Sequence, residues 1–408
     1  MKRVFVLGVV VSVLLMPLMA GSAGAGAMIQ INDDAKIDLG FRLQTLYLNT
    51  DRDLDGDGKF EKIDDFLIRR ARFRLGADIN KNVGIFLQTE FSQDAGSGGD
   101  VRLIDAFVKY KIAKFATIIF GENMAPVTRQ NLTSSGGLMA IDRPGITYKN
   151  LTWGTRALST FSTATYGDSD AGLRGDVDVR DLGITLFGST SFSESSHLKY
   201  YLGVFDGIQK AGKDSERVAG RVQYNIFDAE PGYYGLSTYL GKKKTIGFGA
   251  AFDVQSNVAD DLATGTTVDY SMSTVDAFAE IPVGSGTLTA EGAFIDLDLE
   301  DATQLDPVGD GTLSDAKDAN QSQGDGYYIQ AGYLISKWQP WIEFENWDAD
   351  AASGKGSFDT SRVGLTYYME GHNANIKVGY ELFSSDALIG STSEDEIQTV
   401  AVGFYVTY

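Results

Sequence analysis

The sequence predicts an all-β protein: a transmembrane antiparallel β-barrel of 16 strands, with 18 as the alternative, and with a loop that folds inward as a constriction. Three observations favour this fold class. Apolar and polar residues alternate at both ends of the chain, the 47 glycines, 23 phenylalanines and 19 tyrosines are typical of a turn-rich β protein, and no run of about 18 apolar residues follows residue 27. A backbone in lipid must pair its polar groups internally, so only helices and closed β-barrels cross a membrane. Because the sequence lacks an apolar run long enough for a spanning helix, the closed barrel is the structure that remains.

Residues 1–27 have the pattern of a secretory signal peptide. Lys2 and Arg3 precede the apolar run Val4–Met19, and an A-x-A cleavage site ends at Ala27. This run is short for a membrane span, although an uncleaved anchor is the alternative. We therefore expect residues 28–408 to form one mature domain, because no Pro-rich or Ser-rich linker interrupts them.

The expected mature chain is acidic and lacks cysteine. Removal of Lys2 and Arg3 leaves 33 of the 35 basic residues against 55 acidic ones, a net charge of −22. Such a charge repels nucleic acid, so we expect no nucleic-acid partner. The absence of cysteine excludes disulfides, thiol chemistry and cysteine-ligated zinc.

The first and last strands of the expected barrel alternate almost without fault. One face of the first strand carries Ile37, Leu39, Phe41, Leu43, Thr45 and Tyr47, and one face of the last carries Val400, Val402, Phe404, Val406 and Tyr408. We expect these faces to contact lipid, with an ordinary edge strand as the alternative for the last. Sixteen further candidate strands lie between residues 66 and 384, among them 155–166 and 233–241, and some short pairs would merge.

Three arginines share one face of the second expected strand, residues 66–80. Arg70, Arg72 and Arg74 have the same parity, and Arg42 of the first strand is expected to join them. Charges facing lipid are costly, so this face should line the lumen, where unpaired arginines attract anions. The alternative is that they pair with lumenal carboxylates such as Glu90 or Asp105 and only stiffen the wall.

Other strands place both signs of charge inside. Lys109 and Lys111 share a parity with Asp105, and Glu343 shares one with Glu345. A lumen of mixed charge favours general diffusion over a strict ion filter.

The alternation stops after Gly121 for about 25 residues. A long segment without regular structure is usually functional. It could fold inward and place Arg129, Asp142 and Arg143 at a constriction, or it could lie over the rim as an outer loop.

Residues 53–64, DLDGDGKFEKID, have the spacing of an EF-hand calcium loop. The candidate ligands are Asp53, Asp55, Asp57 and Asp64 with the backbone carbonyl of Lys59. Expected strands flank the loop instead of helices, and an acidic solvated turn is the alternative. Calcium here would brace a loop rather than carry the activity.

Several blocks resemble the phosphate-selective porin O and P family. RRARFRLGADINKNVGIFLQTEFS, LIDAFVKYKI and IIFGENMAPVTRQNLTSS are similar to its N-terminal part, and RDLGITLFGS, WIEFENWDA and GLTYYMEGHNANIKVGYELF follow in order. The resemblance covers most of residues 66–408. It implies a 16-stranded, homotrimeric porin of the bacterial outer membrane with basic side chains at its constriction.

We expect a water-filled channel for passive diffusion of small hydrophilic solutes or ions, with anions preferred, surrounded by outer-membrane lipid and requiring no cofactor. One alternative is a scaffold or sheath barrel for a partner such as an outer-membrane cytochrome complex. An outer-membrane hydrolase is a third class, but His197 and His372 are the only histidines, so we expect no enzyme.

Overall fold

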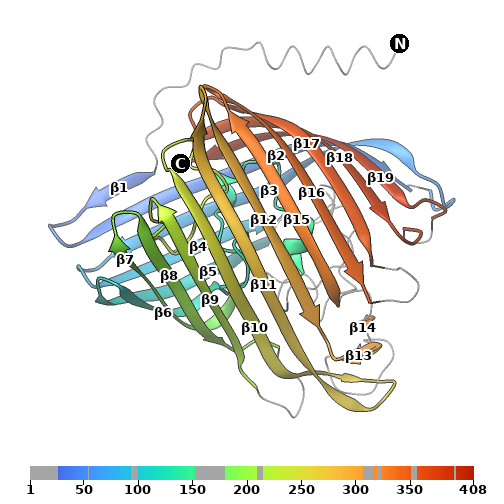
Figure 1. Cartoon of the computed structure of the whole chain (residues 1–408), viewed down its shortest axis with the longest axis horizontal. Helices are drawn as coiled ribbons and strands as arrows, with labels where there is room; N and C mark the ends of the chain where they lie inside the picture. The colour runs from blue at the N-terminus through green and yellow to red at the C-terminus, as the bar shows by residue number, and fades with distance from the viewer. Residues whose placement is uncertain are drawn as a thin grey trace.

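In the computed structural model, an antiparallel sheet closes into a barrel (Figure 1). The structure describes residues 26–53, 55–92, 100–149, 151, 180–208, 215–306, 317–318, 323–350, 356–389 and 392–408. In these ranges no helix is long and apolar enough to cross a membrane. The expected signal peptide lies almost wholly outside them.

Sixteen strands form the wall of the described part. They are β2 (Lys36–Arg52), β3 (Glu61–Asp78), β4 (Val83–Ser92), β5 (Asp100–Ala113), β6 (Ala116–Met124), β7 (Arg180–Ser193), β8 (Ser196–Phe205), β9 (Arg217–Phe227), β10 (Thr245–Asp261), β11 (Thr266–Val283), β12 (Gly286–Asp298), β15 (Gly324–Leu334), β16 (Trp338–Ala349), β17 (Phe358–Tyr368), β18 (Ala374–Ser385) and β19 (Glu396–Thr407). Three short strands, β1 (Ala27–Gln30), β13 (Gln304–Asp306) and β14 (Lys317–Asp318), extend the sheet. The predicted all-β barrel of 16 strands is confirmed.

The barrel closes where β19 pairs with β2, with Val402 opposite Tyr47. The short connections, such as 79–82, 194–195 and 284–285, lie at one end of the barrel, which we call the turn end; the opposite end is the loop end. The predicted strand 155–166 lies outside the described residues. The predicted strand 233–241 is wrong, because these residues belong to a connector that leaves the wall.

The inner and outer faces of β2 follow the predicted parity. Phe41 is exposed on the outside, whereas Arg42 and Gln44 are buried inside. In β3, a bulge opposite Gln44 and Thr45 adds Arg69 to the strand. Beyond this bulge, strict alternation holds and places Arg70, Arg72 and Arg74 inward, as predicted.

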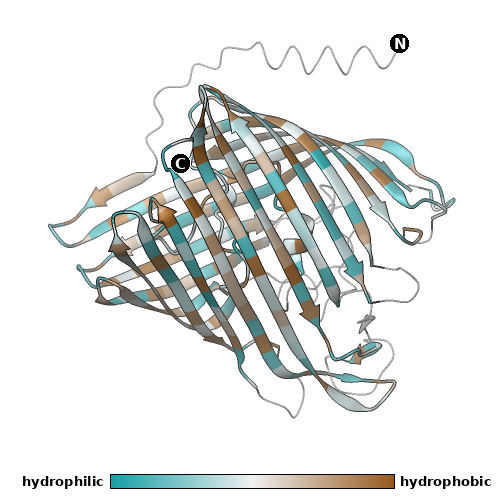
Figure 2. Cartoon of the chain, viewed as in Figure 1, coloured by the Kyte–Doolittle hydropathy of each residue, from teal (hydrophilic) through white to brown (hydrophobic). Residues whose placement is uncertain are grey.

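Toward the loop end, the polar and apolar faces of the wall exchange sides. In β11 the exposed outward residues near this end include Asp269 and Ser271, while Tyr270 and Met272 are buried inward. Nearer the turn end, Val275 faces outward and Asp276 inward. Figure 2 shows both kinds of residue alternating along the strands. A polar outer face cannot lie in lipid at no cost, so the loop end extends beyond the bilayer.

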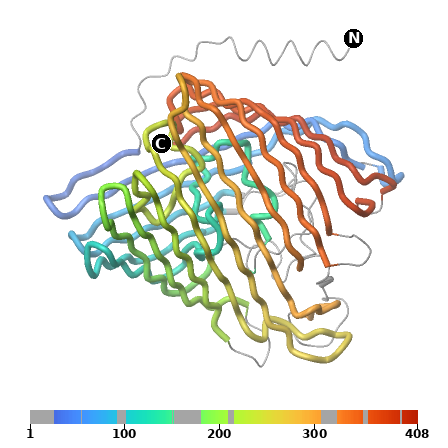
Figure 3. The backbone as a smooth tube through the Cα atoms, in the orientation of Figure 1, coloured from blue at the N-terminus to red at the C-terminus, as the bar shows by residue number. Residues whose placement is uncertain are grey.

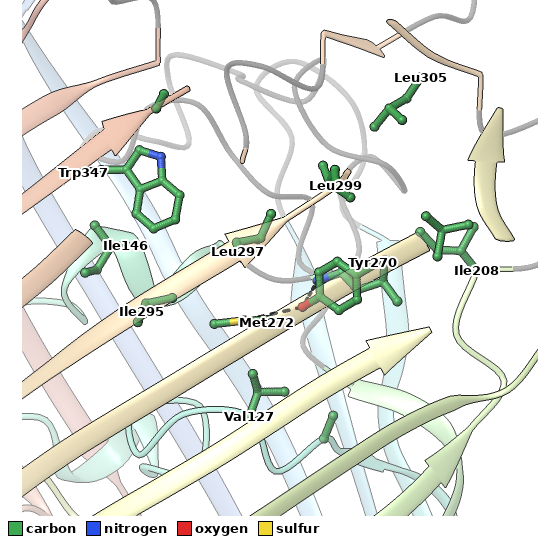
Figure 4. Packing of buried hydrophobic residues seen from close by; sticks show 14 of the residues in the cluster. Val127, Ile146, Ile208, Tyr270, Met272, Ile295, Leu297, Leu299, Leu305 and Trp347 are labelled. Atoms are coloured by element: carbon green, nitrogen blue, oxygen red, sulfur yellow. Dashed lines mark hydrogen bonds between the residues drawn. The ribbon is translucent and has the colours of Figure 1, made fainter. Parts of the chain in front are cut away.

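An apolar core fills part of the lumen near the loop end. Its members come from the wall and from loops, and include Val127, Ile146, Ile208, Tyr270, Met272, Ile295, Leu297, Leu299, Leu305 and Trp347 (Figure 4). The Tyr270 hydroxyl contacts the Met272 sulfur at 3.4 Å. The interior of this end is therefore packed like that of a soluble β protein.

Candidate functional site: the basic wall and two inner segments

Residues 125–149, which we call the inner loop, lie against the inward face of the wall (Figure 3). They contain two short 3-10 turns, Ser135–Gly137 and Gly145–Tyr148. Every residue of the inner loop is buried except Ser134, Gly136 and Asp142. These contacts favour the inward interpretation over a loop that covers the rim. That it narrows the conduction path stays a prediction.

Wall side chains hold the backbone of the inner loop by hydrogen bonds. Donors to its carbonyls are Gln44 to Ser135 (2.6 Å), Thr366 to Met139 (2.9 Å), Lys377 to Leu138 (2.6 Å) and Ala140 (2.7 Å), and Tyr405 to Ile141 (2.8 Å). Apolar contacts add to them, because Met139, Ala140 and Ile141 pack with Leu46, Leu48 and Trp341. These anchors come from β2, β16, β17, β18 and β19 and fix residues 135–141 to that side of the barrel, while Gln130 donates to Glu291 of β12 on another side.

A second segment enters the lumen from the turn end. Residues 228–244 join β9 to β10, and we call them the inner connector. Its backbone pairs with the inner loop: the amide of Ser134 donates to Gly235 O (3.0 Å), that of Gly235 to Leu132 O (2.9 Å) and that of Ser237 to Gly137 O (3.0 Å). Sequence reasoning missed this segment because Tyr, Thr and Leu are common in strands and the stretch is bounded by glycines.

A buried ion pair joins the two inner segments. The Arg129 guanidinium donates to both carboxylate oxygens of Glu230, at 3.0 and 2.8 Å, and its Nε lies 3.4 Å from Glu291. Gln223 and Asn225 donate further hydrogen bonds to Glu230. Burial alone would raise the pKa of the Glu230 carboxyl, but Arg129, the charge of Lys199 and the hydrogen bond from Tyr239 hold it well below its usual range. The predicted site residue Arg129 is therefore buried and paired, and its role in conduction stays a prediction.

The predicted row of arginines lies beside the inner loop. Arg42 and Arg72 both donate to the Ser135 hydroxyl, at 2.6 and 3.2 Å. Arg70 forms an ion pair with Asp142 at 2.8 Å, and so does the bulge residue Arg69 at 2.7 Å. Arg69 was not predicted, although the consecutive arginines at positions 69 and 70 were the available signal.

Ion pairing neutralises only part of this region. Arg72 pairs with Glu90 at 2.8 Å, as the structural alternative predicted. Asp105 pairs instead with Arg180 at 3.0 Å. Arg74 donates to the main-chain oxygen of Tyr408 at 3.2 Å.

We call six arginines the basic wall: Arg42, Arg69, Arg70 and Arg72, which contact the inner loop, Arg74, which lies nearer the turn end, and Arg143 of the inner loop itself. Two carboxylates, Asp142 and Glu90, pair with members of it, which leaves a local charge of about +4 among the described residues. The partly buried Asp142 has a pKa held well below its usual range: burial would raise it, but Arg69, Arg70 and Arg143 outweigh that effect.

Elsewhere on the wall, acidic residues outnumber the arginines that they contact. Arg217 lies between Asp253 (2.6 Å) and Asp181 (3.3 Å), and Arg221 pairs with Asp276 at 2.5 Å. A further group places Arg362 among Glu343, Glu345 and Glu381. The lumen therefore contains both signs of charge, as predicted, but they are separated in space.

The two predicted lysines lie at the turn end. Lys109 pairs with Asp78 at 2.9 Å. Lys109 and Lys111 both line a cavity of about 430 Å³ there. Their role in conduction stays a prediction.

The candidate calcium loop connects β2 to β3. One carboxylate oxygen from each of Asp53, Asp55 and Asp57 lies within 4.8 Å of the others. Asp64 instead accepts hydrogen bonds from Tyr47 (2.7 Å) and Asn49 (2.8 Å). The amide of Lys59 donates to Asp57 at 2.9 Å. Three of the four predicted carboxylates are thus gathered, and calcium binding stays a prediction.

Neither histidine forms a catalytic triad within the described residues. The ring of His197 contacts the Ser191 hydroxyl at 2.7 Å and the Phe227 carbonyl at 2.6 Å. His372 contacts the carbonyl of Thr238 at 2.8 Å, and burial lowers its pKa to about 4. No carboxylate of the described part is hydrogen-bonded to either ring.

Comparison with known proteins decides the family. The sequence pattern of the phosphate-selective porin O and P family matches residues 39–386, which is most of the chain. The chain belongs to this family. It is an outer-membrane porin, and this membership does not favour the sheath barrel. The family also indicates a channel rather than an enzyme.

Individual relatives are distant. An uncharacterised protein from Aquifex aeolicus (strain VF5) is 23% identical, over 84% of this chain and 80% of its own. The porin is similar in fold to an anion-selective porin from Comamonas acidovorans (12% identical, TM-score 0.58, 92% of this chain and 100% of that one). It is also similar to OmpF from Salmonella typhi, solved with daunomycin (17%, TM-score 0.56, 94% and 100%). At these identities the structural similarity concerns the fold alone.

Proposed function

We propose that this porin conducts small hydrophilic solutes and ions by passive diffusion and prefers anions. The observation that supports the preference is the excess of positive charge on the basic wall, six arginines against two carboxylates. Positive charge along a wet path raises the local anion concentration and lowers that of cations. The apolar core at the loop end occupies part of the lumen, so the basic wall borders a larger share of the remaining path.

Arg42 and Arg74 are the best positions for a test. In the described part neither lies within ion-pair distance of an Asp or Glu side chain, so replacing either leaves no carboxylate unpaired. Gln44 and Arg72 still hold Ser135 when Arg42 is changed. One unit charge about 5 Å from a permeating ion contributes about 0.8 kcal/mol in water, a factor of about four before salt screening.

The experiment is the reversal potential in a planar bilayer with a potassium chloride gradient. The unchanged porin should pass chloride in preference to potassium, and R42Q and R74Q should each reduce the ratio by about two- to threefold. K62Q is the matched control, because Lys62 carries the same charge on the outer surface, beside Asp51. A cation-preferring porin, or ratios that stay constant in both variants, would remove the basic wall from the proposal.

We also propose a homotrimer, which the family resemblance implies. Light scattering of the detergent-purified porin should give three chains per particle. A stable monomer that still conducts would contradict this.

A further inference from the structure

A cavity of about 480 Å³ lies at the turn end, bordered by β2 to β7, by the inner connector, and by Gly26 and Ala27 at the end of the expected signal peptide. Aromatic rings line much of it: Phe86, Phe107, Phe187, Tyr233 and Tyr234. They form two groups, with ring centroids 5.3 Å apart for Phe86 and Phe107, 5.0 Å for Phe187 and Tyr233, and 5.1 Å for the two tyrosines. An inorganic ion gains little from such a surface, whereas a planar apolar group packs well against it.

A guanidinium borders the same cavity. Arg74 projects from β3 into it, and the Nε atom is shielded from water without a hydrogen-bond partner. Among the described Asp and Glu side chains, none lies within 4.0 Å of this guanidinium. Gly40 leaves the space that the side chain occupies, because a Cβ there would come within 2.6 Å of Arg74 Nη2.

The other charged groups of the cavity are ion-paired. Asp78 lies between Lys109 (2.9 Å) and Lys36 (3.7 Å), and Asp38 contacts Lys36 at 3.2 Å. Lys36 lies outside the lining, so the charged groups that line the cavity are two basic ones, Lys109 and Arg74, and two acidic ones, Asp38 and Asp78. Of these four, Arg74 alone lies beyond ion-pair distance of a described residue of opposite side-chain charge. The cavity thus combines a guanidinium without an Asp or Glu partner with an aromatic lining.

We infer that this cavity binds small organic anions with an aromatic or otherwise apolar body, the carboxylate on Arg74 and the body among the rings. This inference rests on the proposed anion-preferring channel, of which Arg74 is the member nearest the turn end. A guanidinium suits a carboxylate because its planar donors match the two oxygens. Short connections of such barrels face the periplasm, so the site would hold its ligand on that side.

The test is block of the chloride current by benzoate, added to both chambers of a planar bilayer. Benzoate should lower the single-channel chloride current at millimolar concentration, and acetate at the same concentration should lower it at least tenfold less. Benzylammonium has the same ring with the opposite charge and should not block. Equal effects of benzoate and acetate would overturn the inference.

Two variants examine the two halves of the site. R74Q removes the charge and should raise the half-blocking benzoate concentration at least tenfold. G76A narrows the cavity: a Cβ at Gly76 would find its nearest atoms at 3.8 Å on Asp38 and 3.9 Å on Phe86, so the added methyl group fits without a clash. It should weaken benzoate block, and K62Q should not. Block that is insensitive to both cavity variants would also overturn the inference.

The outcomes separate this site from the proposed function. If the reversal potential shows no anion preference but benzoate still blocks through Arg74, the cavity site holds and the proposed preference fails. If chloride is preferred and benzoate behaves like acetate, the preference holds and the cavity site fails.

Discussion

Replacing Glu230 by glutamine should loosen the contact between the inner loop and the inner connector. The carboxylate accepts both donors of Arg129 and lies in the interior, with 1% of its side chain exposed. Glutamine keeps the shape and one acceptor but removes the charge. Arg129 then remains buried, with Glu291 at 3.4 Å as its remaining carboxylate.

The size of the effect follows from this geometry. Removal of one partner from a buried ion pair costs about 3–5 kcal/mol. Glu291 and the remaining neutral hydrogen bonds still offset part of the cost of burying Arg129. We therefore expect E230Q to destabilise the docked arrangement of the two segments by about 2–3 kcal/mol. At about 1.4 kcal/mol per tenfold change, the undocked arrangement of the two segments should become about 30- to 150-fold more populated.

Single-channel recording in a planar bilayer measures this population. E230Q should shorten the dwell time at the main conductance level and add brief sublevels. D253N is the matched control: Arg217 holds Asp253 at 2.6 Å and has a second carboxylate at 3.3 Å, but this pair lies in the wall. D253N should lower the unfolding temperature without adding sublevels. Stable, unchanged conductance in folded E230Q, or sublevels in D253N, would refute the reasoning.

Three further predictions concern other parts of the porin. Titration calorimetry should detect calcium with a dissociation constant of about 10⁻⁴–10⁻³ M, and D55A or D57A should abolish the heat; heat that persists in both variants would leave only an acidic turn. Because the pKa of Asp142 lies well below its usual range, its contribution to docking the inner loop is present above the ordinary carboxyl pKa and is lost only as the pH falls through the lowered value. Conductance should therefore be the same at pH 7 and pH 5, and an opening or closing step between them would contradict this. I141A removes a buried contact of the inner loop with Leu48 and should destabilise the protein by about 2–4 kcal/mol, visible as a lower unfolding temperature by circular dichroism; a variant as stable as the parent would exclude this packing.

The sequence could predict which face of the wall each strand residue occupies. A period of two assigns each side chain to one face, so Arg42, Arg70, Arg72 and Arg74 were placed inside correctly. The bulge at Arg69 was missed because one inserted residue changes the parity without any change of composition. Residues 233–241 were mistaken for a strand because their composition suits one, although they pair with the inner loop inside the lumen.

The ion pairs were harder to predict than the wall. Glu90 and Arg72 are neighbours across β3 and β4, so register alone brings them together. Arg129 and Glu230 are 101 residues apart, on two segments without regular structure. Their meeting depends on how both segments pack against the lumen, which local sequence patterns do not encode. The gathering of Asp53, Asp55 and Asp57 was predictable because it depends on a single turn.

Near the loop end, the apolar residues of the wall change from the outer face to the inner face. Alternation keeps its period of two along β11, but apolar residues face outward at Val275 and inward at Tyr270 and Met272. A change of medium explains this, because an outer face in lipid must be apolar, whereas one in water may be polar if the interior is packed. The point at which the apolar face changes sides therefore marks the edge of the bilayer on β11. Since the core beyond that edge occupies part of the lumen, the residues that stabilise the loop end also reduce the space left for the proposed conduction path.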